Sequence, residues 1–369
     1  MNRLFRWNQT GLFLLALAAG ILPFAVPEVC AAALREGLTL CSGPLLLSLF
    51  PFLVVSRLLV QCPESDLLAL PFRLAAWGIG IRTPCAARVL CIGFLGGFAP
   101  AASAAAQAVR TGQLTAEEAD ALLPACICSG PSFVVLTVGQ SLLGSAELGV
   151  LLFASQITAN YLTAALLNRF AGVRSVKPGS AAQASPAPPR LDEILADAAI
   201  TYCKLCGFIL FFRMLAAGAG ALLPAGAGTL CAILLEVCSG CDLASRTGRW
   251  GSLLCCAALS VQGLSVLLQV RTICPPEMTL RPLYRARMLH LPLSLALFYL
   301  LLPGGEADVF STLPARVLLM RRVPPDCALL VFAVCCMAAC TLRSGIRQVE
   351  QKQMARNAGG CCINSKTLL

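Results

Sequence analysis

Two long apolar stretches of the chain are each interrupted twice by short groups of small or polar residues. The stretches run over residues 89–143 and 230–270. The interruptions are at residues 96–100, 128–132, 236–240 and 262–265. Inside a bilayer every backbone N–H and C=O group needs a partner, so broken helices persist only where protein or a polar cavity surrounds them. The pattern therefore predicts two broken helical hairpins that bind or move something within a membrane.

The remaining apolar runs predict further membrane helices around these hairpins. They lie at residues 11–26, 38–60, 146–167, 196–223, 288–302 and 327–342, with lengths near the roughly 20 residues that cross a bilayer. The run at 11–26 resembles a signal peptide, but the later runs favour an uncleaved first span, kinked at Pro23. A weakly polar stretch at 61–84 predicts a segment along the interface, and Thr115 and Glu118 have the spacing of a helix capping box.

A linker rich in Pro, Ala and Ser at residues 171–195 divides the chain into two parts. We expect an anchor span at 1–37, a first membrane repeat at 38–170, a second membrane repeat at 196–302, a C-terminal span at 303–342 and a basic cytoplasmic tail at 343–369. The predicted fold is an all-α polytopic membrane protein.

Each repeat is expected to contain one broken, half-spanning hairpin with flanking transmembrane helices, as in many secondary transporters. Aligning the interruptions places Gly97 against Gly240 at the first turn and Gly130 against Gly263 at the second. The alternative is two unrelated kinked hairpins.

The composition agrees with a protein embedded in a membrane. Hydrophobic residues make up 58% of the 369 positions and charged residues 12%, whereas soluble domains average about 45–50% and about 25%. The formal net charge of +10 comes from basic residues that flank the apolar runs, as the positive-inside rule predicts. Because these residues form no basic patch with polar or aromatic readers, we expect no nucleic-acid partner. Basic residues at both ends favour cytoplasmic termini.

Cysteines are numerous but do not predict a metal site or a disulfide scaffold. Most of the 21 lie inside apolar runs, where cysteine packs as a small hydrophobe. Cys238 and Cys241 have ligand-like spacing, but the one histidine, His290, is far along the chain. Nucleophile-elbow, phosphate-loop and dinucleotide-binding fingerprints are absent from the sequence. We therefore expect no metal, no cofactor and no enzymatic activity.

The interruptions carry the candidate binding residues. A helix that restarts after a break exposes unpaired N–H groups and a positive dipole end, which suits an anion. Ser129, Gly130 and Ser132 open one such helix, and Gly263 and Ser265 open the other. The full candidate set is Gly97, Ser129, Gly130, Ser132, Ser239, Gly240, Gln262, Gly263, Ser265 and Gln269. The alternative is that these small residues only allow close helix packing.

Ionisable residues within apolar spans also indicate function, because they are costly there. Glu236 is the clearest example, and Lys204 and Arg213 lie in the preceding span. Since the two cations are nine residues apart, they point to roughly opposite sides of a helix, and at most one faces Glu236. One hypothesis is that Glu236 couples transport to a proton or cation, with one of the two as its partner or as an anion ligand. The alternative is a structural ion pair or a snorkelling arginine.

The motifs at these positions occur in the order of a known family. They are LFPF at residues 49–52, GQLTAEEADALL at 112–123, CICSGPSF at 126–133, TVG at 137–139, LEVCSG at 235–240, and GLSV at 263–266 with Gln269. Together they resemble the YlbJ-type sporulation integral membrane proteins, which carry the nucleoside-recognition, or Gate, domain shared with concentrative nucleoside transporters. The chain departs from the family pattern at residues 96–102, at Ile127 and Cys128, and at Gln262.

The resemblance implies a role in endospore formation, in the mother-cell-derived outer forespore membrane. It implies transport of dipicolinic acid, which agrees with an anion site, and the bilayer and a small anionic solute are then the expected partners. The alternative is a non-transporting scaffold for cortex or coat assembly, with spore-envelope proteins or a second copy as partners of the tail that carries Cys361 and Cys362. A third interpretation is a solute-sensing or metal-ion gate that uses Cys238 and Cys241.

Overall fold

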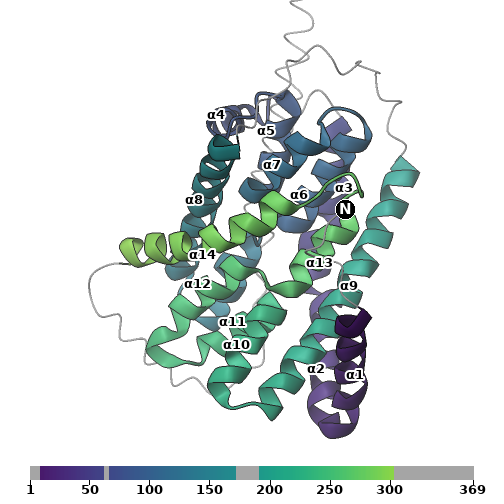
Figure 1. Cartoon of the computed structure of the whole chain (residues 1–369), viewed down its shortest axis with the longest axis vertical. Coiled ribbons are helices and arrows are strands. Elements are labelled where there is room, and N and C mark those ends of the chain that lie inside the picture. Colours follow the sequence, from purple (N-terminus) through teal and green to yellow (C-terminus); the bar gives the residue numbers. More distant parts are fainter. Residues whose placement is uncertain (1–8, 62–65, 172–190, 303–369) are drawn as a thin grey trace, which may run out of the picture.

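A computed structural model describes residues 9–61, 66–171 and 191–302 (Figure 1). Its first helices are α1 (Gln9–Ala25), α2 (Pro27–Ser42), α3 (Pro44–Gln61), α4 (Leu70–Gly78), α5 (Pro84–Gly96), α6 (Phe98–Arg110), α7 (Ala116–Cys126), the π-helix η2 (Ser132–Leu142) and α8 (Ala146–Ala171). The others are α9 (Leu191–Leu222), α10 (Ala225–Leu235), α11 (Val237–Ser245), the short 3-10 helix η3 (Gly248–Trp250), α12 (Gly251–Val261), α13 (Gly263–Ile273) and α14 (Arg281–Leu301). These three described ranges contain no strand, in agreement with the predicted all-α class.

Some predictions fall outside these ranges. The span expected at 303–342, the tail at 343–369 and most of the linker lie outside the described residues. Two helices begin earlier than the sequence predicts. Helix α9 begins at Leu191, so the last residues assigned to the linker are helical. Helix α14 begins at Arg281 rather than near Met288.

The first two predicted spans form three helices. We expected helices at 11–26 and 38–60, but the second helix already begins at Pro27 and ends before Gly43. Helices α1 and α2 meet at an angle of 108°. Proline cannot continue a helix because it lacks an N–H and its ring clashes with the preceding turn, and Pro27 therefore starts α2. The predicted kink at Pro23 lies inside α1, and the sharp bend comes at the second proline.

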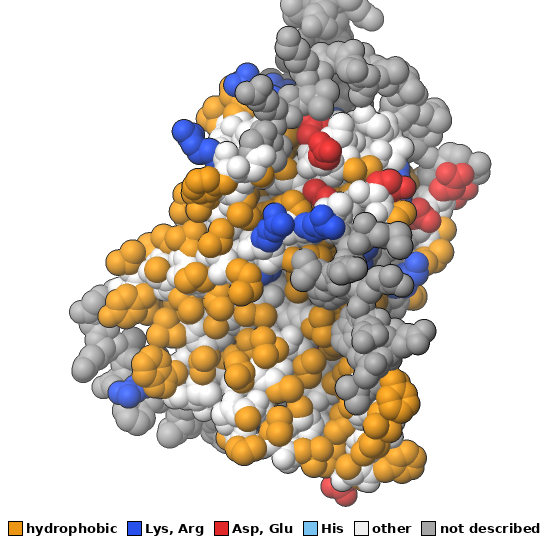
Figure 2. Space-filling view, viewed as in Figure 1, with side chains coloured by type: hydrophobic (Ala, Val, Ile, Leu, Met, Phe, Trp, Pro, Cys, Tyr) orange, Lys and Arg blue, Asp and Glu red, His pale blue; other side chains and the backbone are white. Residues whose placement is uncertain are grey.

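Within the described residues, three helical segments are long and apolar enough to cross a membrane. They are Ala146–Ala171, Leu191–Leu222 and Gly248–Ile273, and the bent pair α1–α2 counts as a fourth if it is one span. Hydrophobic side chains cover the lower part of the face in Figure 2, while most charged side chains gather above. Exposed apolar residues of α10 and α14 include Leu230, Leu234, Met288 and Tyr299. This surface fits an integral membrane protein.

Helix α4 also presents an apolar face. Leu70, Leu74 and Trp77 are exposed at spacings of four and three residues, which places them on one side of the helix. Such a side is what a helix lying on a membrane surface needs. The interfacial segment expected at 61–84 stays a prediction, now centred on α4.

The two short hairpins enter the molecule from opposite ends. Helices α5 and α6 lie in the upper half of Figure 1, and α10 and α11 lie in the lower half. At the upper end the Asp120 carboxylate of α7 accepts the N–H groups of Thr279 and Leu280, at 2.8 Å and 3.0 Å. The start of α7 therefore lies beside the link between α13 and α14.

The N-terminus of α7 carries the predicted capping box. The Thr115 hydroxyl accepts the Glu118 N–H at 3.1 Å, and the Glu118 carboxylate accepts the Thr115 N–H at 3.1 Å. This prediction is confirmed. The two bonds satisfy N–H groups that a helix start otherwise leaves open, and so they fix where α7 begins.

Candidate functional site

The first hairpin turns at Gly97, between α5 and α6. Gly97 has a φ of 80°, a left-handed conformation that side-chain-bearing residues rarely adopt. A Cβ atom on Gly97 would lie 2.7 Å from the Gly130 backbone nitrogen. The turn of the hairpin therefore packs backbone against backbone on the next interruption of the chain.

That next interruption separates α7 from η2. Helix α7 ends at Cys126, and η2 begins at Ser132. Ser129 within the break is 6% exposed, while Gly130 and Ser132 are half-buried. The wide π-helical winding of η2 over 11 residues is unusual, and π-helical segments are frequent at functional sites.

The second hairpin turns at Glu236, between α10 and α11. Glu236 is extended, with φ −152° and ψ 127°. Gly240, which we had aligned with Gly97, lies one turn inside α11, where a Cβ would meet the Ile233 Cα at 2.8 Å. That alignment does not hold, because a side-chain cap rather than a glycine makes this turn. Gly240 instead permits close packing of α10 on α11.

The last interruption is at Gln262, between α12 and α13. Gln262 is left-handed, with φ 67°, and Gly263 follows with φ 70°. A Cβ atom on Gly263 would lie 2.9 Å from the Glu236 backbone nitrogen. The turn of the second hairpin therefore packs on this break, just as the Gly97 turn packs on the break at Gly130.

All four interruptions meet. The Gln262 side-chain amide donates to the Ser129 hydroxyl at 3.4 Å, and this bond joins the two interrupted helices. We call this meeting point the helix-break junction. It consists of Gly97, Ser129, Gly130, Glu236, Gln262 and Gly263. Six residues singled out in the sequence are thus in one place, although their positions span more than 160 residues of the chain.

The other candidates lie within about two helical turns of the junction. Ser239 donates its hydroxyl to Glu236 at 2.9 Å. On α13 the Gln269 amide donates to the Ser265 hydroxyl at 2.8 Å, and both residues are buried. Ser132 opens η2 directly after the break.

The Glu236 carboxylate caps α11. It accepts the N–H groups of Cys238 and Ser239 at 2.8 Å and 2.7 Å, and Glu236 is 2% exposed. Carboxylates are favourable at helix N-termini because the exposed N–H groups and the helix dipole carry partial positive charge there. These donors explain how an acidic side chain is held inside the protein.

Of the two cations that we considered as partners of Glu236, Arg213 lies near enough for its charge to act on that carboxylate. Arg213 donates to the Glu36 carboxylate at 2.6 Å. Lys204 is exposed and lines a separate cavity with Arg57 and Arg110. Within the part of the chain that the structure describes, neither side chain hydrogen-bonds to Glu236, and a role of either cation in coupling or anion binding stays a prediction.

Two buried basic residues of α14 were missed in the sequence. Arg287, 7% exposed, donates to the Ile127 carbonyl at the end of α7 and to the Ser260 carbonyl at the end of α12, the second at 3.3 Å. A cation is favourable at helix C-termini, where the carbonyls carry partial negative charge. Among residues 9–61, 66–171 and 191–302, no carboxylate pairs with Arg287, and its Nε has no partner.

His290 lies beside this arginine. Its Nδ1 is 2.5 Å from the Ser260 hydroxyl, and its Nε2 is 3.2 Å from the Gln156 carbonyl. An arginine and a histidine three residues apart share one face of a helix, and this spacing at the start of an apolar run was the signal available in the sequence.

Several buried polar atoms near the breaks have no partner among the described residues. They are Oδ1 of Asn160, Oγ1 of Thr163, Oε1 of Gln262, Oε1 of Gln269 and Nε of Arg287. Asn160 and Arg287 both donate to the Ile127 carbonyl, so these two residues meet beside the junction. An unpaired buried polar group costs about 1–3 kcal/mol, and such groups call for a ligand or a role. The arrangement can therefore both donate to and accept from a polar solute.

Metal-ligating residues do not cluster within the described ranges. No group of three or more His, Cys, Asp or Glu side chains there could hold an ion. Cys241 is buried, and its carbonyl accepts the Cys255 thiol at 3.4 Å. Cys238 is half-buried on the preceding turn.

Comparison with family models, with curated proteins and with solved structures gives no match to this chain.

Proposed function

We propose that the protein transports a small anionic solute across a membrane and binds it at the helix-break junction. The observation that carries this proposal is the convergence of four helix interruptions on one buried point, where Gln262 bonds to Ser129. Interrupted helices inside a membrane persist where protein surrounds them or where they line a polar cavity. Discontinuous helices that meet within the bilayer are typical of secondary transporters.

We also propose that the two halves are repeated units of inverted topology. In the first half a hairpin (α5–α6) precedes an interrupted helix (α7–η2) and a continuous one (α8). In the second half the same order recurs as α10–α11, α12–α13 and α14. The two hairpins enter from opposite ends (Figure 1), which supports an inverted rather than a parallel repeat.

Charge favours an anion as the solute. Arg287 brings a buried positive charge, and the helix starts at Ser132 and Gly263 add positive dipole ends. The only acidic member of the junction, Glu236, already accepts three hydrogen bonds from α11. A carboxylate solute would gain from the two donors that are left, Nε of Arg287 and the Thr163 hydroxyl. Glu236 is our candidate for coupling to a proton or cation.

Dipicolinate is the solute that we propose, and the outer forespore membrane is its location. Both come from the resemblance to the YlbJ-type sporulation proteins. The physical support is that a carboxylate of this solute can accept hydrogen bonds from the Arg287 guanidinium and the Thr163 hydroxyl. A non-transporting scaffold would have no need of unpaired polar groups at the breaks.

Uptake of labelled dipicolinate into proteoliposomes tests the proposal. We expect saturable uptake by the full chain and reduced uptake by Ser129→Ala and Ser265→Ala. Ser245→Ala is the matched control, because this hydroxyl bonds only within α11, to the Asp242 carbonyl at 2.8 Å. An absence of saturable uptake would overturn the transport proposal and favour the scaffold for cortex or coat assembly.

A further inference from the structure

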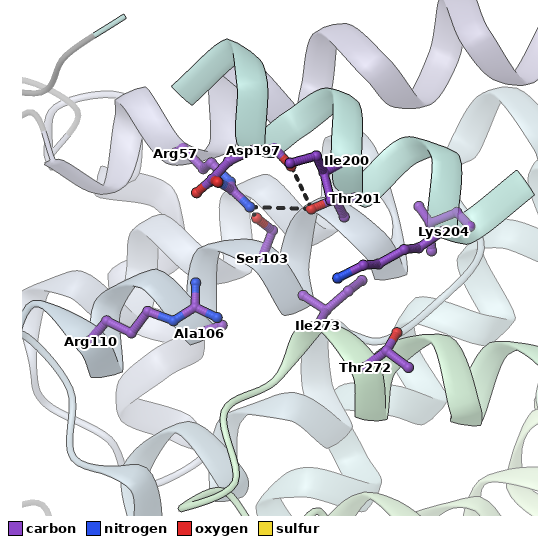
Figure 3. A pocket seen from close by; sticks show the side chains of 11 residues that line it. Arg57, Ser103, Ala106, Arg110, Asp197, Ile200, Thr201, Lys204, Thr272 and Ile273 are labelled. Carbon is purple, nitrogen blue, oxygen red and sulfur yellow. Dashed lines mark hydrogen bonds and ion pairs between the residues drawn. The ribbon is translucent and has the colours of Figure 1, made fainter. Parts of the chain in front are cut away.

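A polar cavity of about 150 Å³ lies apart from the junction, between α3, α6, α9 and α13 (Figure 3). It is close to the C-terminal ends of α6 and α13, at the upper end of the molecule in Figure 1. Three cationic side chains line it, from three different helices. They are Arg57 of α3, Arg110 of α6 and Lys204 of α9. Among the described residues that line it, Asp197 is the one acidic residue.

Arg57 already has its partners. It donates to the Asp197 carboxylate at 2.5 Å, to the Ser103 hydroxyl at 3.2 Å and to the Thr201 hydroxyl at 3.3 Å. Arg57 is 7% exposed, whereas the Asp197 side chain is 61% exposed, so this ion pair runs from the interior to the open edge of the cavity. The Asp197 carboxylate therefore already compensates the positive charge of the buried Arg57.

Arg110 and Lys204 are left without a counter-charge. Within the described ranges neither side chain has a hydrogen bond or an ion pair. Figure 3 shows Lys204 reaching from α9 toward Ile273, and Arg110 on the α6 side of the same space. Two like charges that face one small cavity repel each other unless an anion lies between them. Three cations against one carboxylate give the lining a formal charge of +2.

We propose that this cavity binds an oxyanion group, a phosphate or a carboxylate, between Arg110 and Lys204. Arginine and lysine are the side chains that recognise such groups. Ser103 accepts from Arg57 and keeps its own hydroxyl hydrogen to donate. The cavity volume of about 150 Å³ equals that of about five waters at about 30 Å³ each, which suits one oxyanion group with little else.

The site is separate from the helix-break junction. Ser103 and Arg110 lie six and thirteen residues after Gly97. At 1.5 Å per residue the cavity is roughly 9–20 Å along α6 from the turn. The oxyanion has two sources, the headgroup of an anionic lipid or a soluble anion, because basic pockets at one end of membrane helix bundles also hold lipid headgroups. The proposal does not depend on transport of dipicolinate.

Binding of inorganic phosphate to the purified full chain in detergent tests the soluble source. Titrations are made against chloride at equal ionic strength. We expect Lys204→Gln and Arg110→Gln each to raise the Kd about tenfold, the equivalent of about 1.4 kcal/mol, because each removes a charge-assisted hydrogen bond to the anion. Arg285→Gln removes one exposed positive charge of α14 outside the cavity and should leave the Kd unchanged. Asp197→Asn should lower the Kd, because it removes the only negative charge of the lining.

Retention of phosphatidylglycerol tests the lipid source. The full chain is reconstituted in nanodiscs with or without this lipid, and bound lipid is counted by native mass spectrometry after extraction. If the headgroup is the ligand, Lys204→Gln and Arg110→Gln reduce retention and Arg285→Gln does not. Either phosphate binding or lipid retention that depends on Lys204 and Arg110 supports the proposal. If neither readout responds to them, or if Arg285→Gln has the same effect, the cavity is not an oxyanion site.

Folding is checked in parallel by helical circular dichroism and size-exclusion chromatography. Lys204 and Arg110 are exposed and unbonded within the described ranges, so their substitutions keep every hydrogen bond of the cavity wall. A loss of dipicolinate uptake with normal phosphate or lipid binding would count against the proposed function and not against this site.

Discussion

The side-chain amide of Gln262 donates to the Ser129 hydroxyl across a sequence separation of 133 residues. This bond joins the interrupted helix of the second half of the chain to that of the first. Gln262 makes it from a left-handed backbone, a conformation that costs L-residues about 1–2 kcal/mol. The neighbouring Gly263 packs on the Glu236 backbone. The strained Gln262 is therefore fixed both by its side-chain bond to Ser129 and by the packing of the next residue.

A double-mutant cycle measures this bond. Ser129→Ala removes the acceptor, and Gln262→Asn shortens the donor by one methylene while keeping a residue that tolerates left-handed geometry. We expect a coupling of about 0.5–1.5 kcal/mol in the free energy of unfolding, the usual net value of a neutral hydrogen bond. Unfolding in mixed micelles supplies the four free energies. Additive effects would show that the two side chains do not interact.

Alanine at the two turn glycines should be far more harmful than alanine at an unobstructed glycine of similar backbone. Gly97→Ala and Gly263→Ala place a Cβ within 3.0 Å of backbone atoms, in addition to the cost of a positive φ. Gly112→Ala is the control, because Gly112 has φ 70° but nothing within 4 Å of a Cβ. We expect the control to lose about 1–2 kcal/mol of free energy of unfolding, and the other two variants to lose about 1–3 kcal/mol more. Thermal unfolding in detergent measures the difference, and equal losses at all three positions would contradict the backbone contact.

Arg287 should contribute to solute binding beyond its role in stability. Arg287→Met removes the donations to the Ser260 and Ile127 carbonyls and leaves the second with only the long bond from Asn160, and a buried group that loses its donor costs about 1–3 kcal/mol. Arg271→Met is the matched control, because Arg271 donates to the carbonyls of Met278, Cys274 and Pro275 at the end of α13. Both substitutions should lower the thermal unfolding temperature. Only Arg287→Met should also raise the KM for dipicolinate, and a similar KM in both variants would limit Arg287 to a structural role.

Substitutions at Glu236 and Glu118 distinguish a role in transport coupling from a role in capping a helix. Both are buried carboxylates that cap a helix start, Glu236 on α11 and Glu118 on α7. Glutamine at either position removes the charge and weakens the cap by about 0.5–2 kcal/mol. If Glu236 exchanges a proton or cation during transport, Glu236→Gln abolishes the pH dependence of uptake, and Glu118→Gln does not. The initial rate of uptake over a range of pH values is the measurement. A pH profile of Glu236→Gln like that of the unmodified protein would remove the coupling role.

The positions of the helix breaks could be predicted because glycine, serine and proline are conspicuous inside apolar runs. The turn at Glu236 was harder to place. Its cap is a carboxylate that accepts backbone N–H groups, so a glycine four residues later looked like the better candidate for the turn. The bend between α1 and α2 was misplaced for a similar reason, since Pro27 starts a helix while Pro23 sits within one.

Contacts between distant helices could not be predicted from the pattern. Arg287 reads as a basic residue flanking an apolar run, and only the packing of α14 against the ends of α7 and α12 shows that it is buried. Arg57, Arg110 and Lys204 come from separate helices, so no spacing in the sequence marks their shared cavity. Each of these residues is ordinary in its own segment.

The contact between Gly97 and Gly130 is made by main-chain atoms alone. Side chains in an interface can change rotamer and keep touching while two elements slide, but main-chain atoms have no such freedom. The hairpin turn at Gly97 must therefore either stay in contact with the break at Gly130 or separate from it as a rigid body. Packed contacts of this kind are bistable rather than continuously deformable. Movement at the centre of this protein would then proceed as a switch between two distinct arrangements.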